Sequence, residues 1–453
     1  TSSTTNALDF HRLINNQNIA WKRPGAVRLV DVGLFAFAYL PYLAITQSFP
    51  VSGLYGALNH LVALTSIVFL SFPWRYPYAL YRIFYLFSLI GYAVIPRIEY
   101  SEGISYWRGS VDVFSQYEHA SILVLLALFI FHATYSLSGK HTGPTLAAPT
   151  RTLEEVSGAR LIAVSAAAVI IIYAINGFAW QAVFVRDMNA SAVSGSLGLL
   201  YGNFLRTIPC IALLTFLMGR KRHPVIGILL LSLFVAGNPI SGLSRWMGSS
   251  MYLAVFIAGL PALFLVRHFL AFCVAGGLLV LFPLLDQFRH FSGTIRFEQD
   301  FTWIYQGHFD SFQNFARAMD TETVTYGSQL AGALLFFVPR AIWPDKPIGS
   351  GHLISGYSDL TLSNVSMNIL GEGYMNFGLI GVLLFTVVVS VLCAKLDTSF
   401  WRSPRFPLHW RVFFLLFLGG FFFMIRGDLM SSFAYMCGFW FSARFVAALA
   451  VRR

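Results

Sequence analysis

The sequence predicts an all-α polytopic membrane protein, and three observations lead to that prediction. Hydrophobic residues make up 57% of the chain and charged residues 11%, against roughly 45–50% and 25% in ordinary soluble domains. Apolar runs of about the length needed to cross a bilayer recur along the chain. Basic side chains gather in alternate connections between these runs, as expected when one set of connections faces the cytoplasm.

We expect about twelve transmembrane helices in a single transmembrane domain, residues 1–453. The expected spans begin near residues 29, 54, 78, 119, 159, 197, 224, 248, 268, 374, 412 and 430. The polar stretch Thr1–Arg28 precedes the first span and shows no secretory signal pattern, so we interpret it as a cytoplasmic tail.

The basic clusters indicate the orientation. They include Lys22-Arg23, Arg220-Lys221-Arg222 and Arg452-Arg453. An even number of spans places both termini on one side, and the positive-inside rule makes that side the cytoplasm. The net charge of +11 therefore reflects orientation rather than nucleic-acid binding.

Sequence motifs exclude several chemistries. The four cysteines all lie inside apolar runs, so they indicate neither a disulfide framework nor a thiolate metal site. The chain has no Walker loop, no His-Glu-x-x-His, no Gly-x-Ser-x-Gly and no Asp-x-Asp. A soluble nucleotide donor at the inner face is therefore not expected.

The segment Asp286–Phe377 separates two apolar runs by roughly ninety residues, far more than a helix connection needs. We expect a large outer loop at about residues 286–373. Its stretch Phe336–Pro347 holds an arginine, a lysine and a carboxylate between aromatic residues and prolines, and Gly371–Tyr374 adds a second carboxylate. Because prolines fix the backbone, this composition indicates a site rather than a linker.

Four arginines lie at expected outer membrane boundaries, where positive charge is normally avoided. They are Arg186, Arg245, Arg340 and Arg426. A guanidinium group presents a planar fork that matches phosphate oxygens, so several at one depth predict an anionic ligand such as a lipid pyrophosphate. The alternative for Arg186 and Arg426 is a snorkelling anchor or a local pair with Asp187 or Asp428.

Two residues are candidates for a general base. Glu372 lies between two glycines at the start of a span, where partial desolvation suits that role, and its alternative is to cap a helix N-terminus. His352 is the second candidate, with a surface loop histidine as the alternative. Lys346 is either a ligand contact or a solvated loop charge. His308 and Asp310 are interpreted as a structural corner of an interfacial amphipathic helix.

Several stretches resemble one known family. They are Gly332–Arg340, Trp343–Pro347, Gly349–Gly351, Asn364–Ser366 and Glu372–Gly378, with weaker similarity in Ser241–Arg245 and Gly307–Asp310. Together they resemble the bacterial oligosaccharide repeat-unit polymerases, the O-antigen or exopolysaccharide polymerases of the Wzy type. The resemblance covers about residues 235–395 and is one of topology elsewhere.

The resemblance implies a GT-C-like protein of the bacterial inner membrane with a large periplasmic loop. It implies transfer of the growing glycan from undecaprenyl pyrophosphate to the next lipid-linked repeat unit, without metal or nucleotide cofactor. Arg245 and Arg340, and then Arg186, would bind the donor and act in catalysis. A chain-length-regulating co-polymerase is an expected partner.

The resulting hypothesis assigns a role to each candidate residue. Arg340, Arg245 and Arg186 neutralise the departing pyrophosphate, and Glu372 or His352 accepts the proton of the attacking hydroxyl. Lys346 and Arg426 add charge to the binding site. The rings of Trp303, Tyr305, Trp343 and Tyr374 either stack on sugars or belong to the interfacial aromatic belt.

Two alternatives share part of this pattern. An O-antigen ligase-type transferase would use the same donor and the same residues with a different acceptor. A lipid or glycan transporter would need a cavity open alternately to both sides, and the chain shows no internal repeat of the kind common in transporters.

Overall fold

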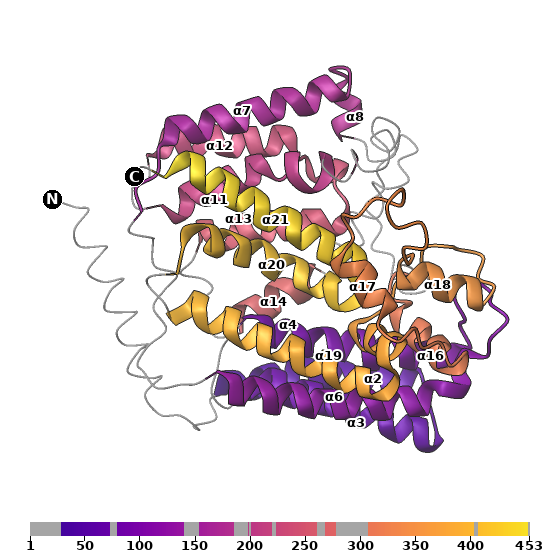
Figure 1. The fold of residues 1–453 in the computed structure, drawn as a ribbon. Coiled ribbons are helices and arrows are strands. Elements are labelled where there is room, and N and C mark those ends of the chain that lie inside the picture. The colour runs from indigo at the N-terminus through magenta and orange to yellow at the C-terminus, as the bar shows by residue number, and fades with distance from the viewer. Residues whose placement is uncertain are drawn as a thin grey trace.

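The computed structural model describes residues 29–72, 79–139, 154–184, 198, 201–219, 223–260, 268–277, 307–402 and 406–451. Within these residues the regular structure is helical, apart from one isolated bridge between Val156 and Val451 (Figure 1). Ten of the described helical segments are long and apolar enough to cross a membrane. The all-α prediction is thus confirmed, and the described helices fit a multi-pass membrane protein.

The described helices before residue 206 are α2 (Leu29–Ser48), α3 (Gly53–Ser71), α4 (Ala79–Phe87), η1 (Ser88–Val94), α5 (Ile95–Glu102), η2 (Val113–Gln116), α6 (Tyr117–Ser138), α7 (Gly158–Ile175), α8 (Trp180–Phe184) and η3 (Tyr201–Leu205). The later helices are α11 (Ile208–Met218), α12 (Pro224–Gly237), η4 (Ile240–Gly242), α13 (Arg245–Gly259), α14 (Phe269–Gly276), α16 (Ser311–Asp320), α17 (Ser328–Leu334), α18 (Ser350–Tyr357), α19 (Ile369–Arg402), α20 (Leu408–Arg426) and α21 (Leu429–Ala450).

The expected spans near residues 248 and 268 correspond to α13 and α14. Helix α13 has 15 residues and the described part of α14 has 8, whereas about 20 are needed to cross the hydrocarbon core. The total of twelve spans therefore stays a prediction.

Helices α4, η1 and α5 follow one another without a break and form a central crossing. Nearly all of their residues are buried, whereas α2 buries only Asp31, Leu34 and Tyr42. Helix α4 packs against α14, α19 and α20, and α20 also packs against α13 and α21. In Figure 1 the long helices run side by side, with α7 and α12 at one margin and α2, α3 and α6 at the other.

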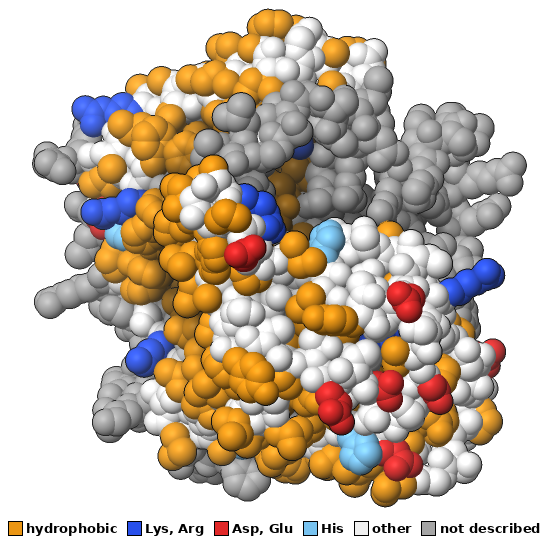
Figure 2. Space-filling view, turned by 45° about the vertical axis from the view of Figure 1, so that its right-hand side comes forward, with side chains coloured by type: hydrophobic (Ala, Val, Ile, Leu, Met, Phe, Trp, Pro, Cys, Tyr) orange, Lys and Arg blue, Asp and Glu red, His pale blue; other side chains and the backbone are white. Residues whose placement is uncertain are grey.

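One end of the bundle carries most of the additional structure, and we call it the polar end. It holds the connection 103–112, helices α16 to α18 and the turn between α20 and α21 (Figure 1). Exposed carboxylates gather there (Figure 2): Glu102, Asp112, Asp320, Glu322, Asp345 and Asp359. Arg108 and Arg340 are also exposed at this end, whereas Arg160, Lys395 and Arg444 are exposed toward the opposite end, where the described acidic residues are buried or half-buried. This separation has the same sense as the charge asymmetry used to predict the orientation.

From Gly307 onward, the expected outer loop forms short helices packed onto the bundle. Residues Ser311 to Ala318 of α16 are all buried, so this helix lies within the protein, and its position at the membrane interface stays a prediction. The buried polar side chains of this helix are hydrogen-bonded: Gln313, Asn314 and Arg317 donate to backbone carbonyls of the neighbouring connections. These bonds offset the cost of burying them. Residues 286–306, including Trp303 and Tyr305, lie outside the described residues.

Helix α19 consists of two helical parts joined by a bend. Phe377 and Gly378 have non-helical backbone angles, and Gly378 has a φ of 61°, which glycine adopts more readily than other residues. The bend brings the backbones of Gly373 and Gly381 together, because a Cβ at Gly381 would lie 1.9 Å from the carbonyl oxygen of Gly373. Residues 369–376 therefore form an arm at the polar end, and the crossing itself begins after Gly378.

At the opposite end, the start of α7 lies against the end of α21. The amide of Ser157 donates to the carbonyl of Ala450 at 2.9 Å, and Val156 and Val451 form an antiparallel bridge. Two segments far apart in the chain are joined there.

Candidate functional site

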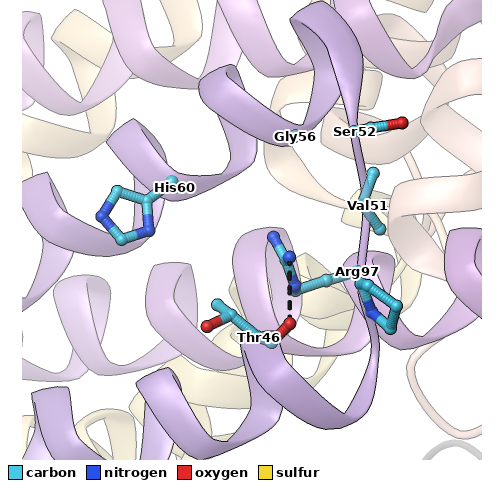
Figure 3. A pocket seen from close by; sticks show the side chains of 7 residues that line it. Thr46, Val51, Ser52, Gly56, His60 and Arg97 are labelled. Carbon is cyan, nitrogen blue, oxygen red and sulfur yellow. Dashed lines mark hydrogen bonds between the residues drawn. The ribbon is translucent and has the colours of Figure 1, made fainter.

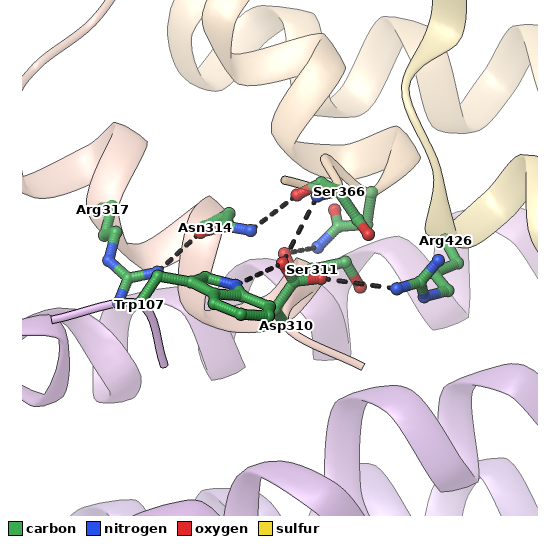
Figure 4. Close-up of polar contacts among 8 residues, drawn as sticks. Trp107, Asp310, Ser311, Asn314, Arg317, Ser366 and Arg426 are labelled. Carbon is green, nitrogen blue, oxygen red and sulfur yellow. Dashed lines mark hydrogen bonds and ion pairs between the residues drawn. The ribbon is translucent and has the colours of Figure 1, made fainter. Parts of the chain in front are cut away.

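A buried carboxylate, Asp310, lies at the centre of the polar end (Figure 4). Asp310 immediately precedes α16, but its side chain does not cap that helix. Its Oδ2 atom accepts from Trp107 Nε1 at 3.0 Å and from the amide of Ser366 at 3.4 Å. Its Oδ1 atom faces Arg426 Nη2 at 3.6 Å. Three separate segments therefore meet at one carboxylate.

The packing of Trp107 onto α16 depends on Gly307. A Cβ at this glycine would lie 2.4 Å from the indole ring, and Gly307 has a φ of 69°. Trp107 itself has a φ of 67°, a conformation that is uncommon for residues other than glycine. Because the surrounding contacts hold the indole in this position, its N–H group reaches Asp310.

Helix α16 adds a cation that is fully buried, Arg317. Arg317 donates to Asn314 Oδ1 and to the carbonyl of Tyr106, both at 2.6 Å, and the amide of Asn314 donates to the carbonyl of Ser366 at 2.8 Å. Burial lowers the pKa of Arg317, while nearby Tyr117 and Asp310 raise it. These contacts join α16 to the segments that contain Tyr106 and Ser366. We therefore interpret Arg317 as a residue that positions α16, and with it Asp310.

Arg426 ends α20 and reaches toward Asp310 (Figure 4). At 3.6 Å the contact with Asp310 is an ion pair without a hydrogen bond. The Nε atom of Arg426 and the Oδ1 atom of Asp310 are both buried and make no hydrogen bond with the described residues. Because buried polar atoms are normally hydrogen-bonded, these two indicate a place for a further polar group. The Arg426 side chain as a whole is 24% exposed, although these two atoms are buried.

Asp428 and Glu372 together cap the first turn of α21. Asp428 Oδ1 accepts from the amides of Met430 and Ser431, at 2.7 and 3.3 Å. Glu372 Oε1 accepts from the amide of Leu429 at 2.8 Å, and its Oε2 accepts from Ser350 Oγ at 2.8 Å. The structure thus assigns Glu372 a capping role, but on a helix other than its own. The side chain of Asn368 caps α19 instead, through the amide of Gly371.

His352 lies in the first turn of α18 and is exposed. It is close enough to Asp428 to lower the pKa of that carboxyl, although burial, the larger influence, raises it. The other carboxylate oxygen of Asp428 lies over Gly349, where a Cβ would be 2.0 Å away. The start of α18 and the start of α21 therefore both face the same pair of carboxylates, Asp428 and Glu372.

Arg340 and Lys346 hold the turn between α17 and α18. Arg340 Nη1 donates to the carbonyl of Lys346 at 2.8 Å and contacts that of Pro344 at 3.5 Å. Lys346 Nζ donates to the carbonyls of Phe336 and Val338, and burial and the nearby Arg340 lower its pKa. The structure thus assigns Lys346 to the turn. Arg340 is exposed, and its Nε and Nη2 atoms make no hydrogen bond to the described residues.

The remaining predicted residues are placed as follows. Tyr374 is half-buried and its ring packs at 68° to that of Phe315, with 6.3 Å between centroids. Trp343 is half-buried in the turn, where its carbonyl accepts from the amide of Lys346. Arg245 begins α13, and its side chain lies outside the described part of the structure. Arg186 lies outside the described residues altogether.

The structure brings some of the predicted residues together and separates others. Glu372, His352 and Arg426 lie around the turn between α20 and α21, and the turn with Arg340 approaches it because Gly332 packs between Met430 and Pro347. No contact joins the Arg340 guanidinium to the Glu372 carboxylate in the described part of the chain. Arg426 pairs with Asp310 rather than with Asp428, the local partner that the sequence offered.

The sequence indicates a structural role for Asp310 and does not distinguish Arg317 from other charged residues. The available signal was the spacing of Asp310, Asn314 and Arg317, which repeats at the helical interval of three to four residues. That spacing predicts a polar stripe on α16. It does not predict that the stripe faces the interior.

The described residues hold no group of three or more His, Cys, Asp or Glu side chains that could bind a metal ion. The polar side chains described at the site are guanidinium groups, carboxylates and one imidazole. Comparison of the chain with protein-family models, with curated proteins and with solved structures finds no match.

Proposed function

We propose that the protein is a glycosyltransferase that polymerises lipid-linked oligosaccharide repeat units at the periplasmic face of the bacterial inner membrane. The observation that carries this proposal is a pair of atoms at the polar end: Arg426 Nε and Asp310 Oδ1 are buried and make no hydrogen bond to any residue that the structure describes. A guanidinium beside a carboxylate at the end of a membrane-length helix suits a substrate with a pyrophosphate and a hydroxyl group. The resemblance of residues 235–395 to repeat-unit polymerases supports the same function.

Arg426 and Arg340 supply the charge that stabilises the leaving group. Nη1 of Arg340 is fixed on backbone carbonyls, so its remaining N–H groups are oriented without further loss of freedom. Arg426 is partly buried, where its interaction with a phosphate oxygen is stronger than in water. Both groups would stabilise the pyrophosphate as negative charge develops on it.

Asp310 is the carboxylate best suited to accept the proton. Among the described residues its Oδ1 atom has no hydrogen-bond donor, whereas both oxygens of Glu372 accept hydrogen bonds, from Ser350 and Leu429. The oxygen of the acceptor hydroxyl forms the new bond to the anomeric carbon, and its proton passes to Asp310. The bond between that carbon and the pyrophosphate oxygen breaks, and undecaprenyl pyrophosphate leaves with the electron pair. Glu372 positions α18 and α21 around this site.

The test is polymer formation by the purified protein in nanodiscs that contain lipid-linked repeat units. Arg426→Ala and Arg340→Ala should each lower the rate by about 10²–10³-fold, the range for loss of one stabilising donor. Asp310→Asn keeps an acceptor for Trp107 and Ser366 and should lower the rate by about 10²–10⁴-fold. Arg108→Ala and Glu102→Gln, at exposed positions of the same end, are the matched controls.

Normal polymer length and amount with Arg426→Ala, Arg340→Ala and Asp310→Asn would refute the proposal. Loss of activity in His352→Gln but not in Asp310→Asn would assign the base to His352 instead. A single transfer to an acceptor that is not a lipid-linked repeat unit would identify a ligase-type transferase.

A further inference from the structure

A cavity of about 490 Å³ opens between α2, α3 and α5, apart from the candidate site. It is lined by the end of α2 at Thr46, the connection 50–52, the first two turns of α3 at Gly56 and His60, and Arg97 of α5 (Figure 3). Its size falls in the range of ligand sites, roughly 300–1,000 Å³.

The charge in this cavity comes from Arg97, which is only 5% exposed. Its Nε donates to the carbonyl of Phe49 at 2.9 Å, but its Nη1 and Nη2 contacts, to Asn59 and to the carbonyl of Thr46, are both 3.5 Å long. Those distances are at the outer limit of a hydrogen bond. The two Nη atoms therefore hold donors that are weakly engaged.

No carboxylate in the described residues pairs with Arg97. The nearest acid along the chain is Glu99, two residues on, and side chains two apart lie on different sides of a helix. Glu99 accepts from Tyr117 at 2.8 Å and thus faces α6. A buried guanidinium without a counterion is costly, so an anion is expected beside it.

Three further features of the cavity favour an anion. His60 is half-buried and makes ring contacts with Tyr39 and Tyr42, but its nitrogens form no hydrogen bond with the described residues. Ser52, before α3, does not cap that helix with its side chain. The cavity thus also receives the positive end of a 19-residue helix.

The surroundings indicate that the anion belongs to a lipid. His60 lies seven residues into α3, which is about 10 Å along the axis. If the ends of this 19-residue helix lie at the headgroups, the cavity extends from the headgroup level into the outer part of the hydrocarbon region. Large apolar side chains flank it on the outer surfaces of α2 and α3, where Leu40, Leu54 and Leu61 are 63%, 57% and 45% exposed. These surfaces offer a place for acyl chains.

We infer that this cavity binds the phosphate group of an anionic membrane lipid, held by Arg97, His60 and the start of α3. The inference goes beyond the proposed glycan transfer and needs only that the helices span a membrane. The site would distinguish a lipid with net negative charge from a zwitterionic one, because Arg97 lacks a carboxylate that could pair with a choline group.

The experiment measures lipid retention by native mass spectrometry. The purified protein is exchanged from nanodiscs of phosphatidylcholine, with or without phosphatidylglycerol, into neutral detergent. Wild type should retain one phosphatidylglycerol in preference to phosphatidylcholine. Arg97→Gln should lower its apparent affinity about tenfold or more, the effect of losing one charge-assisted contact.

His60→Phe is the second variant, because it keeps the ring contacts with Tyr39 and Tyr42 if Arg97→Gln fails to fold. Arg108→Gln, an exposed arginine at the same end, is the matched control and should retain the lipid. Equal retention by wild type, Arg97→Gln and His60→Phe would overturn the inference. Thermal stabilisation by inorganic phosphate equal to that by phosphatidylglycerol would overturn the assignment to a lipid.

Discussion

Two opposing influences act on Asp428. Burial raises the pKa of its carboxyl, whereas the amides of Ser431 and Met430 and the nearby His352 lower it, and burial is the larger influence. The folded protein therefore binds this proton more tightly than the unfolded chain does, in which an aspartate titrates near about 3.9. The stability that this carboxyl contributes is complete below that pH and is lost as the pH rises through the raised pKa.

Asp428→Asn should remove this dependence, because an asparagine does not titrate and still offers a side-chain oxygen to the amide of Met430. We expect the melting temperature of wild type to fall relative to that of Asp428→Asn as the pH is raised above about 4. Thermal unfolding of both proteins in the same detergent across that range measures the effect. A difference that stays constant with pH would contradict the assignment of the titration to Asp428.

The sequence could predict which kinds of residue gather at the polar end, but not their partners. Arg426 illustrates the limit, since its charge at a membrane boundary is visible in the sequence while its partner, Asp310, comes from a distant segment. Glu372 was expected either as a base or as a cap, and the structure shows it capping α21. Which amide a carboxylate reaches depends on how three helices pack, and helical periodicity does not encode that.

Among the elements, the long helices were predictable and the short ones were not. The starts of α2 and α12, at residues 29 and 224, agree with the predicted positions because an apolar run begins there. Helices α17 and α18 have 7 and 8 residues, too few for a periodic pattern to be recognised. The first part of α19 was missed because its polar residues are not typical of a membrane span.

The bend in α19 gives the next prediction. Gly381→Ala would place a Cβ 1.9 Å from the carbonyl oxygen of Gly373, so the two parts of the helix would have to separate. We expect a loss of stability of about 1–3 kcal/mol or more, as for other overpacked positions. Thermal unfolding measures it against the control Gly356→Ala, where nothing lies within 4 Å of the added carbon. Equal melting temperatures of the two variants would show that the contact is not needed.

For the whole molecule, the separation of charges predicts which end faces the cytoplasm. Asp345 is exposed at the polar end and Arg160 at the opposite end. In a cysteine-free background, Asp345→Cys should react with a membrane-impermeant thiol reagent in cells whose inner membrane is intact. Arg160→Cys should react only after permeabilisation. Labelling of both positions from the same side would contradict the predicted orientation.

The hydrogen bond between Ser157 and Ala450 bears on the synthesis of the chain. The start of α7 is synthesised long before α21. During translation the Ser157 amide therefore lacks the Ala450 carbonyl that accepts its hydrogen bond in the folded protein. A protein that ends before Ala450 would contain nearly every described helix and still lack the acceptor for the Ser157 amide at the start of α7. Loss of the residues from Ala450 onward should therefore weaken the packing of α7, which lies in the first half of the sequence.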